Sequence, residues 1–246
     1  RVNPDIDPKT HPYISTGLKT SKFGIAIEDS YDAYIEASKM KNIDVVGIDA
    51  HIGSQIFDLQ PFEDSLLRLE ELYHKLNDLG INIRFIDIGG GLGIKYKDDD
   101  IPPTKKEFAE KIIKTMKKIN CSLILEPGRS LVGNAGYLIS KVLYKKKSNQ
   151  KNFLIIDAGM NDILRPSLYN AYHKVSKSIQ ASDNSEIFDI VGPICETGDV
   201  ISYDTKLNDA KIGDNIIIHS AGAYGSVMSS NYNSRPKVPE VLVSGK

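Results

Sequence analysis

A loop in the second half of the chain places a thiol beside acidic side chains. Its sequence is GPICETGD, residues 192–199, and it holds Cys195 and Glu196 between glycines. A cysteine with such neighbours is a poor core residue, because they require solvent or a ligand. The thiol could act as a general acid and Glu196 could anchor a cationic group. Cys121, beside the apolar run 123–125, is interpreted instead as buried and inert.

Two further segments of the second half carry side chains suited to anionic ligands. In RPSLY, residues 165–169, Arg165 and Tyr169 are four positions apart and share one face if the segment is helical. Tyr224 lies between Ala223 and Gly225. With so little bulk around it, its hydroxyl could reach a phosphate.

Polar and glycine residues of the first half collect where strands are expected to end. The sequences are HIGSQ (51–55), GGGLG (89–93) and EPGR (126–129). Glycine has no Cβ, so its backbone N–H can approach a phosphate oxygen closely. A triple glycine alone is weak evidence, because tight turns explain many such runs. Three such loops in succession, with Ser, Gly and Arg donors, favour phosphate binding.

Three residues of these loops each have a structural and a ligand-binding interpretation. His51 could be a hydrogen-bonded histidine at a strand end, or an aromatic plane stacked on a flat cofactor. Glu126 could cap a helix, or pair with a ring nitrogen and keep it protonated. Arg129 could form a structural ion pair or clamp a carboxylate or phosphate. Their joint position favours the ligand. No pair of His and Cys residues has metal-ligand spacing, so no metal site is expected.

The elements that must position these loops alternate between strand and helix up to about residue 130. Strands are predicted at 44–49, 83–88 and 123–125. Between them, apolar residues at helical spacing over 62–79 predict one helix between Pro61 and Gly80. Thr104 with Glu107 predicts a capping box that begins a second helix. This alternation predicts a parallel sheet with crossover helices. In a (β/α)8 barrel the polar loops would lie at the C-terminal strand ends, where barrel active sites lie.

After Arg129 the pattern changes to closely spaced strands. Gly, Asn, Asp and Pro separate apolar runs, which predict an antiparallel β domain with its boundary near residue 130. The predicted strands are 137–144, 153–156, 187–191, 216–219 and 238–243. The lysine run 145–147 is interpreted as a solvated hairpin turn.

Composition excludes several classes of protein. The chain has 246 residues, with 31 Lys and Arg against 32 Asp and Glu, so its net charge of −1 argues against a nucleic-acid or anionic-membrane partner. Hydrophobic residues at 41% and charged residues at 26% are typical of a globular protein. Two cysteines cannot form a disulfide framework, which favours a reducing, cytoplasmic location. The chain begins with Arg1, so an organellar transit peptide further upstream stays open.

The motifs together resemble one family along the whole chain. In order and at family-like spacing from Arg1 to about Val243, the chain resembles the diaminopimelate decarboxylases in RVNPDIDPKTHPYISTGLKTSKFGI, HIGSQ, DIGGGLGI, EPGRSLV, DAGMNDILRPSLYNAYH, GPICETGD and GAYGSVMSSNYN. These enzymes belong to the fold type III, pyridoxal-phosphate-dependent decarboxylases, with ornithine decarboxylase a more distant relative. The resemblance implies an α/β plus β fold. Residues 1–130 would form the C-terminal part of an alanine racemase-like (β/α)8 barrel that binds pyridoxal 5'-phosphate, and residues 131–246 a β domain that completes a partner subunit's site.

The resemblance also implies a role for each candidate residue. His51 would stack on the pyridine ring, and Glu126 would pair with its nitrogen. The phosphate would be held by Ser54, Gly91, Gly128, the Arg129 backbone and Tyr224. Substrate would be bound by Arg129, Arg165, Tyr169, Glu196 and Tyr224. Cys195 would deliver the proton after carbon dioxide leaves, and Cys195 and Glu196 would come from the neighbouring subunit of a homodimer.

The implied reaction is decarboxylation of meso-2,6-diaminoheptanedioate to L-lysine and CO2, the last step of lysine biosynthesis. The alternatives are a related decarboxylase of the carboxynorspermidine or arginine type, or a non-catalytic binding paralogue. Residues 165–169 with Cys195 and Glu196 match the diaminopimelate branch, and the cysteine and phosphate glycines argue against a non-catalytic protein. The family's Schiff-base lysine lies in an early barrel strand. We expect it upstream of Arg1, so that this chain is a fragment lacking it.

Overall fold

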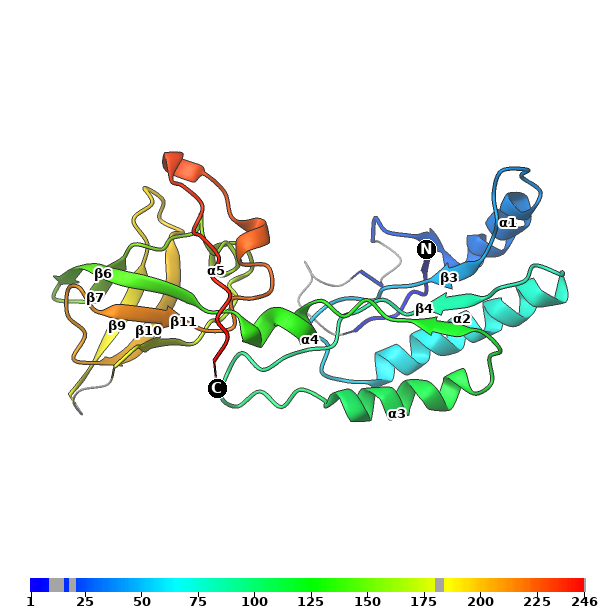
Figure 1. The fold of residues 1–246 in the computed structure, drawn as a ribbon, viewed down its shortest axis with the longest axis horizontal. Helices are drawn as coiled ribbons and strands as arrows, with labels where there is room; N and C mark the ends of the chain where they lie inside the picture. The colour runs from blue at the N-terminus through cyan, green and yellow to red at the C-terminus, as the bar shows by residue number, and fades with distance from the viewer. Residues whose placement is uncertain (9–15, 18–20, 180–183, 246) are drawn as a thin grey trace. The chain divides into compact units, whose positions relative to one another are not determined.

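The chain divides into two compact units. The computed structural model describes residues 1–8, 16–17, 21–179 and 184–245 (Figure 1). The first unit consists of Arg1–Ile94 and Ile101–Ser130, and the second of Lys95–Asp100 and Leu131–Lys246. Nothing in the sequence indicates that residues 95–100 group with the second unit. Residues 9–15 and 18–20, in the opening motif of the family resemblance, lie outside the described residues.

A three-stranded parallel sheet, in the order β3-β4-β5, forms the centre of the first unit. Its strands are β3 (Gly47–Asp49), β4 (Phe85–Asp87) and β5 (Ser122–Ile124). Helix α2 (Gln60–Asp78) connects β3 to β4, and α3 (Lys105–Met116) connects β4 to β5. The predicted alternation of strand and helix is therefore confirmed. The unit also contains α1 (Ile27–Ser38) and the parallel pair β1 (Val2–Asn3) and β2 (Ile25–Ala26), which were not predicted.

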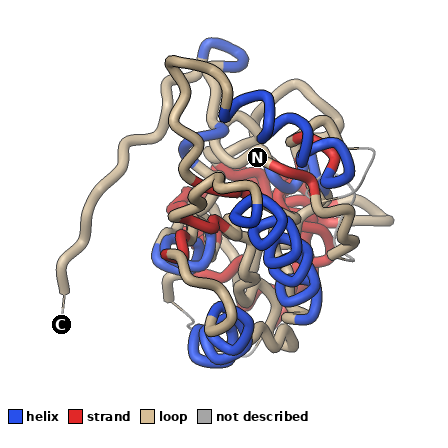
Figure 2. Tube along the Cα trace, turned by 90° about the vertical axis from the view of Figure 1, so that its right-hand side faces the viewer, coloured by secondary structure: helices blue, strands red, loops and turns tan. Residues whose placement is uncertain are grey.

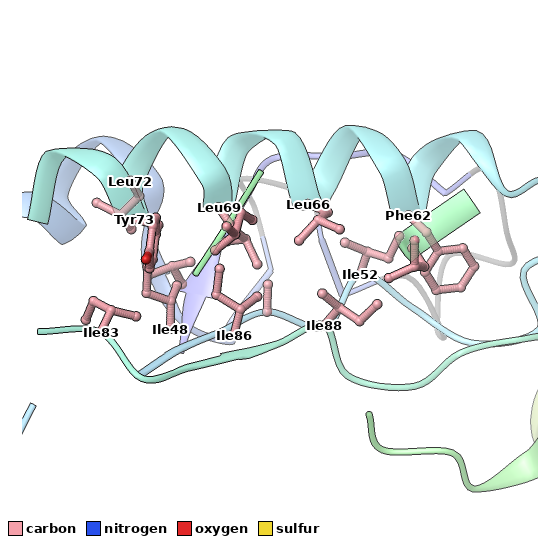
Figure 3. Packing of buried hydrophobic residues seen from close by; sticks show 14 of the residues in the cluster. Ile48, Ile52, Phe62, Leu66, Leu69, Leu72, Tyr73, Ile83, Ile86 and Ile88 are labelled. Atoms are coloured by element: carbon pink, nitrogen blue, oxygen red, sulfur yellow. The ribbon is translucent and has the colours of Figure 1, made fainter. Parts of the chain in front are cut away.

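Helix α2 covers the sheet with the apolar face that the sequence predicts. Pro61 stands in its first turn, where the missing N–H does no harm. The side chains of α2 point toward isoleucines of the strands and adjoining loops (Figure 3). The buried members on the helix are Phe62, Leu66, Leu69, Leu72, Tyr73 and Leu76. Leu79 is the exception on the predicted face, because the helix ends at Asp78 and leaves Leu79 exposed.

Helix α3 begins as predicted. Thr104 accepts a hydrogen bond from the Glu107 N–H, and the Glu107 side chain accepts one from the Thr104 N–H. The capping box is therefore confirmed. The rings of Phe62 and Phe108 meet edge to face at 5.1 Å, which packs α2 against α3.

The second unit is built on a six-stranded sheet in the order β10-β9-β7-β6-β11-β8. Its strands are β6 (Leu138–Lys147), β7 (Asn152–Ile156), β8 (Val175–Lys177), β9 (Ser185–Val191), β10 (Val200–Asn208) and β11 (Asn215–Ile218). The strand pairs are antiparallel except β7 and β9, which run parallel. The β domain is thus confirmed, and its sheet is mixed. The short helix α5 (Arg165–Tyr169) lies outside the sheet, and the short helix α4 (Arg129–Val132) spans the boundary between the two units at Ser130.

Two local predictions for this unit are wrong. Residues 238–243 form loop instead of a strand (Figure 2), and Leu242 there is 98% exposed. The sequence VPEVLV contains valines, but it also contains Pro239, which cannot donate to a strand pair, and no described strand pairs with it. Residues 145–147 belong to β6, and the turn follows at 148–151. Lys145 and Lys147 share one face of the strand, where both pair with Glu186.

Strands β8 and β10 were not predicted. The β10 sequence VISYDTKLN is largely polar, and its pairing with β9 shifts register twice. Asp204 in β10 has a positive φ of 46°. Such irregularity removes the regular alternation by which a strand is recognised in a sequence. Among the described residues, no helix is both long enough and apolar enough to cross a membrane.

We expect the face of α2 to decide the stability of the first unit, and two neighbouring leucines test this. Leu66 is 0% exposed and Leu67 is 37% exposed. Leu66→Ala should lower the free energy of unfolding by about 2–5 kcal/mol, because it removes buried contacts and leaves a cavity. Leu67→Ala is the matched control and should lower it far less. Urea unfolding of the full-length protein measures both, and equal losses would contradict the assigned face.

Candidate functional site

Three carboxylates meet at the C-terminal ends of the parallel strands. Asp49 and Asp87 are the last residues of β3 and β4, and they stand opposite each other in register. Glu126 follows β5, and its N–H donates to the Gly89 carbonyl at 2.9 Å. One oxygen from each of the three carboxylates lies within 4.8 Å of the others. Sequence reasoning found Glu126 but missed the two aspartates, whose partners only the strand register reveals.

The negative charges of this acidic cluster (Asp49, Asp87 and Glu126) repel one another. Burial raises the pKa of Asp49, and the charge of Asp87 raises it further. The pKa of Glu126 is raised by burial and then by both aspartates. Asp49 Oδ1 is buried and has no hydrogen-bond partner among the described residues. The acidic cluster therefore favours a cationic or proton-donating group beside it.

His51 is fixed just beyond β3. Its Nδ1 accepts a hydrogen bond from the Gly90 N–H at 3.1 Å, so this nitrogen carries no proton. Burial lowers the pKa of His51, and the charge of Arg1 lowers it further. A Cβ at Gly89, where φ is 68°, would lie 2.6 Å from Nδ1. Glycine is required there, and it leaves a neutral imidazole ring in one orientation. The hydrogen-bonded interpretation of His51 is observed, and stacking on a cofactor stays a prediction.

Donor groups collect on the neighbouring loops of the same unit. Arg129 is buried, and its Nε and Nη2 donate to Ser54 Oγ at 3.3 and 3.1 Å. Gly91 has a φ of 108°, and a Cβ there would lie 2.2 Å from the Gly53 carbonyl oxygen. A Cβ at Gly128 would meet nothing within 4 Å among the described residues. Ser54 and Arg129 thus supply hydrogen-bond donors, and Gly128 leaves open space at its Cβ position. Such donors and space are what an anionic group requires.

In the second unit, residues 165–169 form α5 as the spacing allows, so Arg165 and Tyr169 lie on a helix. Arg165 is 7% exposed, and its Nη1 lies 2.8 Å from His173 Nε2. Its guanidinium carbon lies 4.6 Å from the centre of the Tyr96 ring. Sequence reasoning missed both neighbours. Tyr96 is far upstream, and His173 was quoted only as the end of a family motif.

The loop GPICETGD is organised by its own last residue. Asp199 is 3% exposed, and its two carboxylate oxygens accept the N–H of Met160 at 2.6 Å and of Ile194 at 2.7 Å. A Cβ at Gly192 would lie 2.3 Å from this carboxylate, so only glycine fits. Burial raises the pKa of Asp199, and the two backbone N–H bonds oppose that rise. Asp199 therefore joins this loop to residues 157–162.

Cys195 is exposed, as its neighbours in the sequence indicate, but Cys121 is not fully buried as predicted. Cys195 and Glu196 are exposed, whereas Cys121 is only partly exposed, and burial raises the pKa of its thiol. The Ser167 hydroxyl donates to the Gly198 carbonyl at 2.7 Å, which ties α5 to the loop. The second unit thereby brings the α5 segment and the Cys195 loop together.

Two tyrosines follow later in the chain. The Tyr232 hydroxyl donates to Glu196 Oε1, and this hydrogen bond raises the pKa of Tyr232. Tyr232 stands in SSNYN, part of a quoted motif, yet sequence reasoning gave it no role. Tyr224 has a φ of 60°, a backbone conformation that a non-glycine residue rarely adopts.

One protein family matches the first half of the chain. Residues 1–133 match the model of the pyridoxal-dependent decarboxylase family, pyridoxal binding domain. The chain belongs to this family.

Its curated relatives are diaminopimelate decarboxylases. The protein from Aquifex aeolicus is 48% identical over 99% of this chain and 58% of its own length, and that from Pseudomonas fluorescens is 49% identical over 100% and 58%. Among solved structures, the diaminopimelate decarboxylase from Helicobacter pylori complexed with L-lysine superposes with a TM-score of 0.92. It is 43% identical, and the match covers 97% of this chain and 59% of that one. The chain thus spans about 58% of the length of the curated relatives.

We expect Asp199 to hold the loop that carries Cys195. In Asp199→Asn the amide must present its NH2 to one of two N–H donors, so one buried hydrogen bond is lost. The free energy of unfolding should fall by about 1–3 kcal/mol, and hydrogen exchange at the Met160 and Ile194 amides should accelerate. Asp204→Asn is the control, because Asp204 is exposed and Asn tolerates its positive φ. Unchanged exchange at both amides would contradict this role.

Proposed function

We propose that the protein containing this chain is a pyridoxal-phosphate-dependent decarboxylase that converts meso-2,6-diaminoheptanedioate to L-lysine and CO2. The observation that carries the proposal is the match to diaminopimelate decarboxylases along essentially the whole chain, at 48–49% identity. The L-lysine bound to the Helicobacter pylori relative supports the product. Family membership also supports an enzyme over a non-catalytic paralogue.

The first unit suits the two ends of the cofactor. Pyridoxal phosphate carries an anionic phosphate and a ring nitrogen that accepts a proton. Arg129, Ser54 and the glycines at 91 and 128 would hold the phosphate, and Glu126 would pair with the ring nitrogen. The raised pKa of Glu126 beside two aspartates suits a partner that brings positive charge. His51, neutral and fixed by Gly90, would lie against the ring.

When bound, the cofactor supplies an electron sink for the electron pair that stays on carbon after its bond to the carboxylate breaks. The residues of this chain would do the rest. Arg165 and Tyr169, with Arg129, would bind substrate carboxylates, and Glu196 would bind the distal group. Cys195 would return one proton to the carbon, which balances the loss of CO2. Its exposure allows the thiol to reach a substrate. Tyr224 would contact both phosphate and substrate.

The active form would be a homodimer in which Cys195 and Glu196 complete the partner subunit's site. Cys195 and Glu196 are exposed, on a loop that the buried Asp199 holds through two backbone hydrogen bonds. This exposure suits side chains that contribute to another subunit's site. Both cysteines are free, which agrees with the reducing, cytoplasmic location we propose.

Replacement of the proposed proton donor tests the mechanism. Cys195→Ala in the full-length enzyme should lower kcat by roughly 10²–10⁴, the usual contribution of a general acid. Cofactor binding, measured by titration with pyridoxal phosphate, should stay near wild type because the phosphate donors lie on other loops. Cys121→Ala, the control, should lower stability and leave kcat unchanged. The assignment is wrong if the two substitutions exchange these effects.

Complementation tests the shared site. An inactive Cys195→Ala variant is mixed with an inactive variant of the upstream Schiff-base lysine, and subunits are allowed to exchange. Random mixing gives heterodimers with one intact site each, so about a quarter of wild-type activity should return. No recovery, with exchange verified by mass spectrometry of the mixed dimers, would contradict the shared site.

A further inference from the structure

The second unit buries an arginine, a histidine and a tyrosine together. Arg165 is 7% exposed and His173 is 0% exposed. Arg165 Nη1 lies 2.8 Å from His173 Nε2, and His173 Nδ1 lies 2.9 Å from the His219 carbonyl oxygen. The Tyr96 ring lies under the guanidinium and meets the His173 ring edge to face at 5.5 Å.

The geometry points to His173 as a positioning residue that sets the orientation of the Arg165 guanidinium for a substrate carboxylate. This inference rests on the proposed function, which assigns carboxylate binding to Arg165.

The two contacts of His173 define its proton. A carbonyl oxygen only accepts hydrogen bonds, so His173 Nδ1 must carry the hydrogen that it donates to His219. An arginine has no acceptor, so Nε2 must offer its lone pair to the Arg165 N–H. A neutral imidazole in this one tautomer satisfies both contacts. Protonation of Nε2 would remove the acceptor and place a second cation against Arg165.

Two contacts of different kinds then fix the guanidinium. His173 accepts from one nitrogen at its edge, and the Tyr96 ring lies against its face. The backbone of Tyr96 is itself held, because the Tyr96 backbone N–H donates a hydrogen bond to Asp100 Oδ2 at 2.8 Å. Lys174, next to His173, donates hydrogen bonds to both carboxylate oxygens of Asp98 at 2.9 Å. These bonds hold residues 95–100 against the start of β8. A planar ion fixed at one edge and one face has a defined plane.

This orientation matters because a guanidinium pairs with a carboxylate through two parallel hydrogen bonds only when the two planes align. An arginine that is already aligned loses little freedom when substrate binds. His173 would thus act on substrate binding through Arg165. The effect should appear mainly in KM, because the carboxylate contact is the same before and during the reaction.

Two amides test the role in the full-length enzyme. His173→Asn places its amide near the Nδ1 position, so it keeps a donor for His219 and loses the acceptor for Arg165. His173→Gln is long enough to reach both. We expect Asn to raise KM for diaminopimelate about tenfold to a hundredfold, the value of a hydrogen bond to a charged group, with a much smaller change in kcat. Gln should restore most of the affinity. His173→Phe, which keeps the ring but has no acceptor, should behave as Asn does.

A double-mutant cycle with Arg165→Lys separates this inference from the proposed function. Arg165→Lys should raise KM, and adding His173→Asn should then change KM little, because the group it orients is already gone. If Arg165→Lys leaves KM unchanged, the proposed role of Arg165 fails. If Arg165→Lys raises KM while a folded His173→Asn or His173→Phe enzyme keeps the wild-type KM, the positioning role is overturned. Full additivity of the two KM effects would overturn it as well.

Discussion

The convergence of three parallel strand ends imposes the main constraint on the first unit. Register places Asp49 opposite Asp87, and the chain after β5 returns Glu126 to the same point. Like charges at this distance in a partly buried place are unfavourable, and burial adds to the penalty, as the raised pKa values of Asp49 and Glu126 show. The hydrophobic face of α2 must supply the stability that permits this arrangement, because the acidic cluster itself opposes folding at neutral pH.

Backbone packing around the same point leaves little choice of residue. Gly89 makes room for His51, and a Cβ at Gly90 would lie 2.2 Å from the Glu126 carbonyl oxygen. Because these loops touch through their backbones, the imidazole and the carboxylate are held with little freedom. Preorganised side chains of this kind are what binding a rigid, charged cofactor requires.

The second unit uses buried polar groups to hold the side chains and loops proposed to bind substrate. Asp199 is buried so that Cys195 and Glu196 can be exposed in a fixed loop, and His173 is buried behind Arg165. In both cases a buried group forms hydrogen bonds with the protein through both of its polar atoms. Such bonds are worth most where water is absent, which explains why these positioning groups are among the least exposed polar residues of the unit.

The parts of this molecule that follow local rules could be predicted from the sequence. The capping box at Thr104 and the apolar face of α2 depend on spacing along one helix, and both are observed. Residues that depend on distant partners could not be predicted. The register that joins Asp49 to Asp87, the placement of Tyr96 beside Arg165 and the irregular strand β10 come from tertiary pairing. The failed strand at 238–243 shows the converse, since strand propensity without a pairing strand produced a loop.

This division has a physical basis that bears on the candidate site. A helix cap forms among residues that are already neighbours, whereas the acidic cluster in the first unit and the buried arginine in the second each form only when that unit has its tertiary packing. Repulsion between like charges opposes the acidic cluster, and desolvation opposes burial of the arginine. The packing energy that offsets both costs is distributed over the whole hydrophobic core. A ligand that brings positive charge to Glu126 would relieve part of this opposition, so cofactor binding and folding of the first unit should reinforce each other. The acidic cluster is thus least favourable for the empty fold and most favourable for the fold with its proposed cofactor, which is the behaviour expected of a site shaped for binding.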